Sequence, residues 1–348
     1  MKKLVSLLLA LALTLVCAAA LADTVTDMTG REIALDAPAT RVVALTASDV
    51  EILYALGAGD TLVGRGEYCD YPAECLEVPV VKSGAETNLE EILALEPQVV
   101  LMATMAQTVE QVQALEQAGV KVIVSDAQNI EGVYEAIRLI AAVVGRQTEG
   151  EALVGSMQAA FADIAARAKD SGETVYFEVS PLQWGLWTAG SGTFMDELAG
   201  MIGLKNAFAD VTGWAAISEE QVLERDPDYI VTISMYFGEG PTPVEEIVGR
   251  PGWDALKAVK NGHVFNADSN EVSRPGPRLV DAAEALAEFV EGDEVVEPAA
   301  SDGSLGEAWP LPFPLWRYLQ WQGSAPAGAG RGLCDRSGAA ARSPLKTP

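Results

Sequence analysis

Residues 98–124 read QVVLMATMAQTVEQVQALEQAGVKVIV, and this stretch decides the fold class. Its two ends, 98–102 and 120–124, are short runs of mainly apolar residues rich in valine, which predict buried strands. Between them, 109–118 carries apolar residues at helical spacing and stops before Gly119, a residue type that favours the end of a helix. A strand, a helix and a second strand in this order predict a parallel sheet.

The same alternation continues on both sides of this stretch. Upstream, 41–45 predicts a strand and 49–56 a helix. Downstream, 131–169 has a helical pattern, and two glycines, Gly145 and Gly150, are the candidate breaks in it. Strands are then expected at 174–179, 229–234 and 264–266, and helices at 193–201, 244–259 and 278–290.

This order of elements predicts an α/β protein with two lobes, each built on a parallel-rich sheet, bridged by one long α-helix. The expected N-terminal lobe is 23–147, the bridging helix 148–169 and the C-terminal lobe 170–291. The bridge is expected to be a single helix because 151–168 is rich in alanine and contains no turn residues.

The two halves also share a repeated pattern. Residues 88–101 read NLEEILALEPQVVL, and residues 218–231 read SEEQVLERDPDYIV. Each begins with a residue that caps helix N-termini and continues with two helical turns, a proline and a strand. Glu90 and Glu220 occupy the same place in the two copies. A repeat of this kind predicts two similar lobes.

The first 22 residues are typical of an export signal. A basic start precedes the apolar run 4–16, and ALA at 20–22 is an A-x-A cleavage site, so the mature chain is expected to begin at Asp23. We therefore expect an exported protein, in the periplasm or at the extracellular face of the cytoplasmic membrane. Cys17 offers an alternative in which lipid is attached to that cysteine, but it follows a valine, where such sites favour a small residue.

The charge of the chain excludes several classes of partner. The sequence has 50 acidic and 23 basic residues, and its formal net charge is −27. Such a surface repels nucleic acid and anionic lipid, so we expect no nucleic-acid partner. It suits a protein that works in bulk solvent or docks on basic partners.

The sequence carries no recognisable catalytic or metal-binding constellation. His263 is the only histidine, and its solitude argues against a site for a bare metal ion, which needs several histidines, and against a Ser-His-Asp triad. There is no G-x-S-x-G motif, and the Gly-Ser-Gly at 190–192 lacks the third glycine of a dinucleotide fingerprint. We expect no catalytic residues, no metal ligands and no enzyme activity.

Cys69 and Cys75 lie in one proline-containing loop, 68–79. Export allows a disulfide between them, and the alternative is two thiols that never pair. The sequence leaves both alternatives open.

The segment 292–348 differs from the rest of the chain. Basic residues outnumber acidic ones from 311 onward, aromatic residues crowd a proline-rich stretch, and a Gly/Ala/Ser/Arg-rich run follows. We expect a disordered tail or the product of a shifted reading frame, and we assign no function to it.

Several segments resemble one family, the extracytoplasmic binding proteins of ABC importers for cobalamin, ferric siderophores and haem. The resemblance runs from about residue 24 to 290. The segments that carry it are RVVAL at 41–45, EILYALG at 51–57, YCDYP at 68–72, NLE at 88–90, TAGSGTF at 188–194 and RPGPR at 274–278. It implies two Rossmann-like lobes bridged by one helix, a ligand in the cleft between them, and little movement on binding.

The resemblance also implies partners and docking residues. In this family a glutamate near the start of a helix on each lobe docks on arginines of a permease subunit, and Glu90 and Glu220 match these positions. The alternative is structural, because an acidic residue in the first turn of a helix gains roughly 0.3–1 kcal/mol from the helix dipole. The implied partner is an ABC permease dimer with a cytoplasmic ATPase, and the chain is expected to be a monomer.

For the cleft, the resemblance points to Tyr68, Trp214 and Arg274. Aromatic faces suit a flat macrocycle, and a tryptophan at the place of Trp214 stacks on the ligand in cobalamin binders. Arg274 is expected to hydrogen-bond the polar edge of a ligand or to pair with a carboxylate. The structural alternatives are that Trp214 covers apolar surface and that Arg274 forms a salt bridge.

The ligand expected from the YCDYP loop is a corrinoid, a small-molecule metal chelate, and no cofactor is implied beyond this ligand. A ferric siderophore or haem is the alternative, since GAET stands at 84–87, where a second aromatic is expected, and Asn270 where an acidic contact is expected. From other classes, the chain could be an exported α/β enzyme or a sensor. A neighbouring permease and ATPase gene would favour transport.

Overall fold

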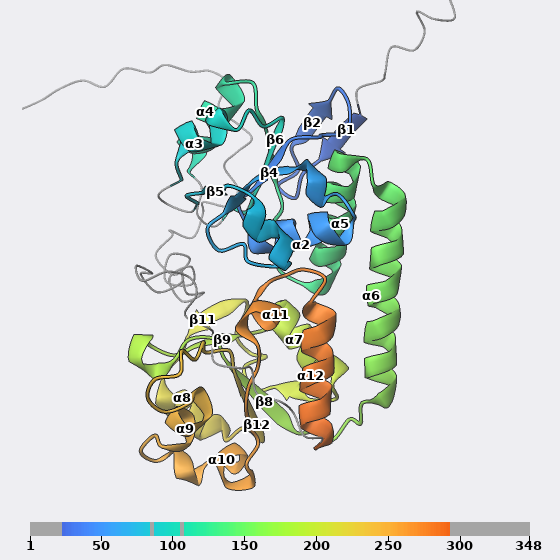
Figure 1. Cartoon of the computed structure of the whole chain (residues 1–348). Coiled ribbons are helices and arrows are strands. Elements are labelled where there is room, and N and C mark those ends of the chain that lie inside the picture. The colour runs from blue at the N-terminus through green and yellow to red at the C-terminus, as the bar shows by residue number, and fades with distance from the viewer. Residues whose placement is uncertain (1–22, 84–86, 105–107, 293–348) are drawn as a thin grey trace, which may run out of the picture.

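The computed structural model describes residues 23–83, 87–104 and 108–292. They form two lobes, one above the other in Figure 1, and helix α6 (Gln147–Arg167) runs along the side of both. The expected α/β class with parallel sheets is confirmed. The expected export signal and residues 293–348 of the tail lie outside the described residues.

The first lobe is built on a parallel sheet with five described strands in the order β5-β4-β3-β6-β7. The stretch 98–124 forms two of these strands and the helix between them, with Val99 opposite Lys121 and Met102 opposite Val124. The strands are β3 (Val42–Ala44), β4 (Leu62–Gly66), β5 (Val80–Val81), β6 (Val99–Met102) and β7 (Lys121–Val124). The helices are α2 (Ala47–Ala55), α3 (Leu89–Ala94), α4 (Val109–Gln117) and α5 (Ile130–Val144), and an antiparallel hairpin of β1 (Asp23–Thr26) and β2 (Glu32–Leu35) precedes the sheet.

The second lobe repeats this plan with four described parallel strands in the order β10-β8-β12-β13. These strands are β8 (Thr174–Glu178), β10 (Lys205–Asn206), β12 (Tyr229–Thr232) and β13 (Val264–Asn266). A separate antiparallel pair consists of β9 (Trp187–Ala189) and β11 (Trp214–Ala216). The helices are α7 (Phe194–Met201), α8 (Glu219–Arg225), α9 (Pro243–Val248), α10 (Lys257–Asn261), α11 (Ser269–Ser273) and α12 (Leu279–Glu291).

Both sheets are buried on both faces, which explains why their strands are almost continuously apolar. In β3, Val42 and Ala44 face one core, whereas Val43 faces another beneath α3 and α4. In β12, Val231 and Ile230 face opposite sides in the same way. This alternation follows from the two-residue period of a strand.

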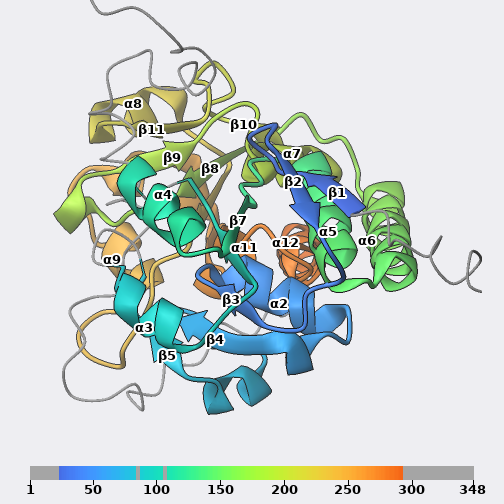
Figure 2. The same cartoon turned by 90° about the horizontal axis from the view of Figure 1, so that it is seen from above.

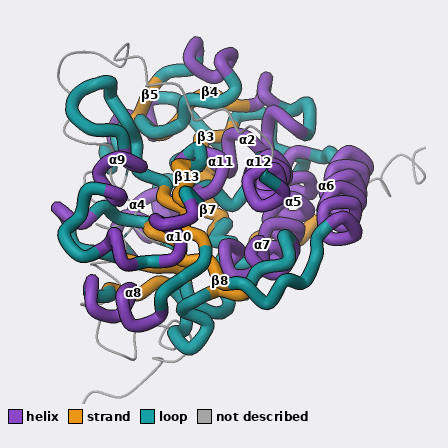
Figure 3. Tube along the Cα trace, turned by 90° about the horizontal axis from the view of Figure 1, so that it is seen from below, coloured by secondary structure: helices purple, strands orange, loops and turns teal. Residues whose placement is uncertain are grey.

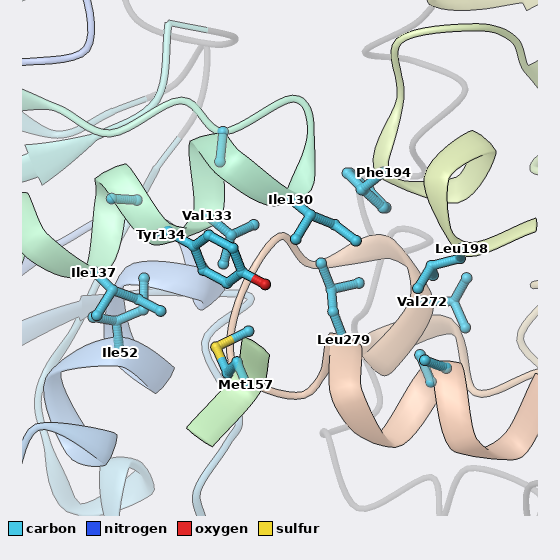
Figure 4. Close-up of a cluster of buried hydrophobic side chains, with 14 of the residues drawn as sticks. Ile52, Ile130, Val133, Tyr134, Ile137, Met157, Phe194, Leu198, Val272 and Leu279 are labelled. Atoms are coloured by element: carbon cyan, nitrogen blue, oxygen red, sulfur yellow. The ribbon is translucent and has the colours of Figure 1, made fainter. Parts of the chain in front are cut away.

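The two lobes share one continuous hydrophobic core. Side chains of the first lobe, among them Ile52, Ile130 and Ile137, pack in the same cluster as Phe194 and Leu279 of the second lobe (Figure 4). Viewed from above and from below, α5, α6 and α12 lie together on one side of the molecule (Figures 2 and 3). The lobes are therefore joined by packing as well as by the helix that connects them.

The two glycines expected to break the helical stretch 131–169 behave differently. Gly145 does so: it follows α5 with φ 69°, a left-handed conformation that glycine adopts without strain. Gly150 lies inside α6, where a Cβ atom would come within 2.7 Å of the Cβ of Ala141 on α5. Gly150 thus allows α5 and α6 to approach closely and does not break the helix.

The prediction of a single helix at 244–259 is wrong. The structure has α9 and α10 there, separated by a turn through Pro251 and Gly252 and a short 3-10 helix, Trp253–Ala255. Proline cannot donate a backbone hydrogen bond, and Gly252 has φ 84°. The helix ends because neither residue fits its interior.

Candidate ligand-binding site

A cavity of about 170 Å³ lies between the two lobes. In the first lobe its lining follows the carboxyl ends of β3, β6 and β7, which is where ligands bind in open parallel sheets. The lining residues are Thr46, Ala47, Ser48, Ala103, Ser125, Asp126, Ala127, Gln128, Phe194, Trp214, Ser273, Arg274 and Pro275.

Trp214 lines this cavity from the second lobe. It is the first residue of β11 and is half-buried. Its ring packs edge-on against that of Phe194, with the ring centroids 5.4 Å apart and an interplanar angle of 62°. Phe194 also lines the cavity but is not among the cleft residues expected from the sequence. Its place at the end of the TAGSGTF motif is the sequence signal that points to it. Together the two rings form an aromatic wall, in which Phe194 is only 3% exposed and Trp214 therefore offers the larger accessible surface.

Arg274 also lines the cavity, but its guanidinium is already engaged. It donates hydrogen bonds to Asp70 Oδ1 at 2.5 Å, to Glu51 Oε1 at 3.2 Å and to the carbonyl of Tyr68 at 3.3 Å. Burial acts to lower the pKa of Arg274, and the hydrogen bonds and charges of Asp70 and Glu51 raise it above its usual value. The salt bridge weighed as the structural alternative is therefore present.

Arg278, the second arginine of the RPGPR motif, converges on the same carboxylate. It donates to Glu51 Oε1 at 2.7 Å and Oε2 at 3.0 Å, and its guanidinium lies 4.1 Å from the ring centre of Tyr71. Glu51, Asp70, Arg274 and Arg278 form what we call the Glu51 cluster. It joins α2 and the loop after β4 in the first lobe to the segment before α12 in the second, and so ties the lobes together beside the cavity.

Tyr68 is not among the residues that line the cavity. The structure instead brings its backbone carbonyl to Arg274. Of the three residues expected in the cleft, two therefore meet at this cavity.

The first-lobe wall combines polar side chains, among them Asp126, with alanines. Asp126 accepts hydrogen bonds from the hydroxyl of Thr104 and from Gln128 Nε2 at 3.3 Å, and burial raises its pKa. Behind the wall lies Asp49, which is fully buried; its Oδ2 accepts a 2.5 Å hydrogen bond from the hydroxyl of Thr46. Burial raises the pKa of Asp49 to about 6, although the Thr46 hydrogen bond acts to lower it. Its other oxygen, Oδ1, has no hydrogen-bond partner among the described residues.

Cys69 and Cys75 are free and buried thiols in this structure. Of the two alternatives that the sequence leaves open, the structure therefore has the unpaired thiols and not the disulfide. The sulfur of Cys75 donates to the carbonyl of Cys69 at 3.5 Å. Burial raises the pKa of both thiols, so they act as small uncharged side chains of the shared core.

Glu90 and Glu220 lie outside the cavity, at the starts of α3 and α8. Both side chains are exposed, and neither forms an ion pair within the described part of the chain. Hydrogen bonds from its own backbone N–H and from Ser218 lower the pKa of Glu220. The adjacent Glu219 has a different role, because it accepts a 2.9 Å hydrogen bond from the indole of Trp253.

The repeat also places an exposed leucine near each of these glutamates. Leu93 on α3 and Leu223 on α8 follow Glu90 and Glu220 by one helical turn, and each is 36% exposed. Residues three apart lie on the same side of a helix. Each lobe therefore presents a carboxylate and an apolar side chain together.

Three further observations concern metal binding, the single histidine and membrane spans. Among residues 23–83, 87–104 and 108–292, no group of three or more His, Cys, Asp and Glu side chains is arranged to hold a metal ion. The ring of His263 stacks on that of Tyr229 at a centroid distance of 4.5 Å. No helix in this part of the chain is long and apolar enough to cross a membrane.

Comparison with known proteins identifies the family. Residues 42–271 match the family described as periplasmic binding protein. An ABC transporter substrate-binding lipoprotein of Bacillus subtilis, YvrC, itself uncharacterized, is 35% identical over 281 residues, which is 79% of this chain and 87% of that protein. A vitamin B12-binding protein of Salmonella typhimurium is 31% identical over 253 residues, 71% of this chain and 89% of that protein.

A solved structure agrees with these relatives. It is described as a possible iron-binding (periplasmic solute-binding) protein of Staphylococcus epidermidis, and it superimposes with a TM-score of 0.63 at 29% identity, covering 73% of this chain and 99% of that one. The resemblance drawn from the sequence motifs is thereby confirmed: the chain belongs to the periplasmic binding protein family that serves ABC transporters.

Proposed function

We propose that this protein binds a corrinoid chelate such as cobalamin between its lobes and delivers it to an ABC importer. The observation that carries this proposal is the interlobe cavity, which has the rings of Trp214 and Phe194 on the second-lobe side and polar side chains interspersed with alanines on the first-lobe side. A flat macrocycle with polar edges complements such a site, because aromatic rings contact its faces and polar groups orient its rim. The vitamin B12-binding relative supports the same ligand class.

The size of the cavity constrains how such a ligand binds. Its volume of about 170 Å³ is below the roughly 300–1,000 Å³ of common small-molecule sites. A whole macrocycle does not fit inside, so either one edge of it enters or the lobes part to admit it. The shared core and the Glu51 cluster oppose a wide opening.

A ferric siderophore or haem is the second candidate, favoured by the likeness to the Staphylococcus epidermidis protein described as possibly iron-binding. An iron chelate would use the same aromatic wall. The two candidates differ in the groups on the rim of the ligand.

For delivery, we assign Glu90 and Glu220 to docking on a permease dimer whose ATPase lies in the cytoplasm. Both carboxylates are exposed, equivalent in the repeat and without an ion pair among the described residues. Each has an exposed leucine one turn away, which suits a basic group set beside an apolar one on each permease subunit. Two equivalent patches on one chain suit a two-fold symmetric partner, and this favours a monomer that docks with both lobes.

We place the protein outside the cytoplasmic membrane. The name of the Bacillus subtilis relative supports lipid attachment, the alternative that uses Cys17. Mass spectrometry of the mature N-terminus distinguishes the two forms, because cleavage before Asp23 leaves no cysteine there and lipidation leaves an acylated Cys17.

The ligand is tested by titrating the purified protein with cyanocobalamin, haem and a set of ferric hydroxamate and catecholate siderophores. Binding is followed by tryptophan fluorescence and by absorbance of the chelate. We expect saturable one-to-one binding of cyanocobalamin. Binding of an iron chelate in its place would establish the second candidate, and binding of none of them would contradict both.

A further inference from the structure

The cavity carries charge unevenly, and this bears on which ligands it accepts. Among the described residues that line it, Arg274 is the only cationic one and Asp126 the only acidic one. The two differ in how far their charges are already compensated by the protein.

The charge of Arg274 is satisfied within the protein. Asp70 and Glu51 accept its hydrogen bonds, and Glu51 also accepts two from Arg278. Glu271 lies a further 3.9 Å from Arg278. Two arginines thus face three carboxylates, so this side of the cavity offers no spare positive charge for an anionic ligand group.

Asp126, on the opposite wall, has no such compensation. Its side-chain partners, Thr104 and Gln128, are neutral donors, and it forms no ion pair within the described part of the chain. Asp126 is half-buried, and partial burial of a carboxylate without a cation is unfavourable, so a donor from the ligand would relieve that cost.

The side chains around Asp126 also leave its negative charge without compensation. Asp49 lies behind the wall, fully buried, and the negative charge of Asp126 acts on it. The other polar side chains nearby, Thr46, Ser48 and Ser125, are neutral hydroxyls. A carboxylate of a ligand placed against this wall would meet a like charge, whereas an N–H donor would find an acceptor.

We propose that Asp126 selects chelates whose side arms end in N–H donors, such as primary amides, against chelates whose arms end in carboxylates. This inference rests on the proposed function, since it concerns the periphery of the ligand bound in that cavity. It makes Asp126 a specificity-determining residue: it accepts a hydrogen bond from an amide and repels an acid.

The test uses two matched pairs of ligands that differ only in the arms. One pair is cyanocobalamin and its separated monocarboxylic acids, in each of which one amide arm is hydrolysed. The other is haem and its diamide, in which both propionates are converted to amides. Calorimetric titrations near neutral pH compare the full-length protein with Asp126→Asn and with Asp163→Asn, the same change at an exposed aspartate of α6.

We expect the wild-type protein to bind the amide member of a pair about tenfold more tightly than the acid, because a like charge at a partly buried site is strongly disfavoured. For the corrinoids, this difference is expected for at least one of the monocarboxylic acids. Asp126→Asn should reduce this ratio to within about threefold, since an asparagine can donate to a carboxylate as well as accept from an amide. Asp163→Asn should keep the wild-type ratio.

The outcomes separate this inference from the proposed function. Selection by Asp126 is overturned if the protein binds cyanocobalamin and each of its monocarboxylic acids with equal affinity. It is also overturned if Asp126→Asn leaves the ratio of amide to acid affinity unchanged. Both results leave corrinoid binding intact. Failure to bind corrinoids, with a preference for haem diamide that Asp126→Asn abolishes, contradicts the proposed ligand and supports the inference. Binding of neither pair overturns both.

Discussion

Asp49 is a residue whose charge works against the folded state. Burial raises its pKa to about 6 from a reference of 3.8, so the folded protein holds this proton more tightly than the unfolded chain does. The contribution of Asp49 to stability is therefore unfavourable above pH 6, diminishes as the pH falls towards 4, and vanishes where the side chain is protonated in both states.

Asp49→Asn removes this titration while keeping the shape of the side chain. At about 1.4 kcal/mol per pKa unit, we expect the variant to be more stable than the wild type by up to about 3 kcal/mol at pH 8, with the difference fading towards pH 4. Urea denaturation of both proteins between these pH values measures it. A stability difference that does not change with pH would contradict this explanation. The control is Asp163→Asn at an exposed site, which should show no pH-dependent difference in stability.

Trp214 is predicted to contact the ligand. Trp214→Ala removes one ring of the aromatic wall, and the loss of stacking should weaken chelate binding by on the order of 1 kcal/mol, or about five- to tenfold. The fold should persist, because the side chain is only half-buried. Calorimetric titration checks the affinity, with Trp184→Ala, an exposed tryptophan outside the cavity, as the control. Unchanged affinity in Trp214→Ala would remove this residue from the site.

At the scale of the element, α3 and α8 are the predicted docking helices. The double change Glu90→Ala and Glu220→Ala should abolish uptake and ATPase stimulation in a reconstituted importer, and each single change should give a partial defect. Ligand affinity in solution should stay near the wild-type value because both side chains lie outside the cavity. Reversal to lysine should be more damaging than alanine, and high salt should weaken docking of the wild type by screening.

The control for docking uses the same two helices. Glu91→Ala with Glu224→Ala removes two exposed charges from α3 and α8 and should leave transport largely unchanged. Normal delivery by the Glu90→Ala, Glu220→Ala protein would refute docking through these residues. A collapse of its ligand affinity would instead assign the two glutamates to binding.

Helix α6 contains two glycines with opposite expected responses. At Gly150 a Cβ atom would lie 2.7 Å from the Cβ of Ala141, so Gly150→Ala should destabilise the protein by about 1–3 kcal/mol through overpacking. At Gly155 nothing lies within 4 Å, so Gly155→Ala should stabilise it by up to about 1 kcal/mol through helix propensity. Thermal unfolding of the two variants tests this, and shifts of the same sign would mean that α5 and α6 are not in close contact at Gly150.

At the scale of the whole molecule, the Glu51 cluster links the lobes. The Glu51 side chain is only 2% exposed and neutralises two arginines from the other lobe. Glu51→Gln removes the buried carboxylate that pairs with both guanidinium groups and leaves Arg278 with only the 3.9 Å contact to Glu271, so we expect a loss of about 3 kcal/mol in the free energy of unfolding. The control is Glu284→Gln, which breaks an exposed pair with Arg167 and should cost about 1 kcal/mol or less. Urea denaturation compares them, and equal small losses would show that the Glu51 cluster does not hold the lobes together.

The class of fold and the family follow from local features of the sequence. The pattern in 98–124, the repeat containing Glu90 and Glu220, and the helix caps are local features, and their residues lie within a few positions of one another. Periodicity and capping act over that range, so the parallel sheets, the break at Gly145 and the equivalent starts of α3 and α8 could be predicted without coordinates. The prediction of one helix at 244–259 is wrong because the apolar periodicity of this stretch is interrupted by Pro251 and Gly252, which do not fit the interior of a helix.

The set of residues that meet at the cavity depends on tertiary packing. Arg274 and Glu51 are 223 positions apart in the chain, and no local pattern indicates that they pair. The same holds for Asp126 and Trp214, which come from different lobes and line one cavity, and for Tyr68, which contributes a backbone carbonyl and not a ring to that region. Such contacts depend on how two lobes pack against each other, and that packing follows from the shape of the shared core, which the order of residues along one strand or helix does not specify.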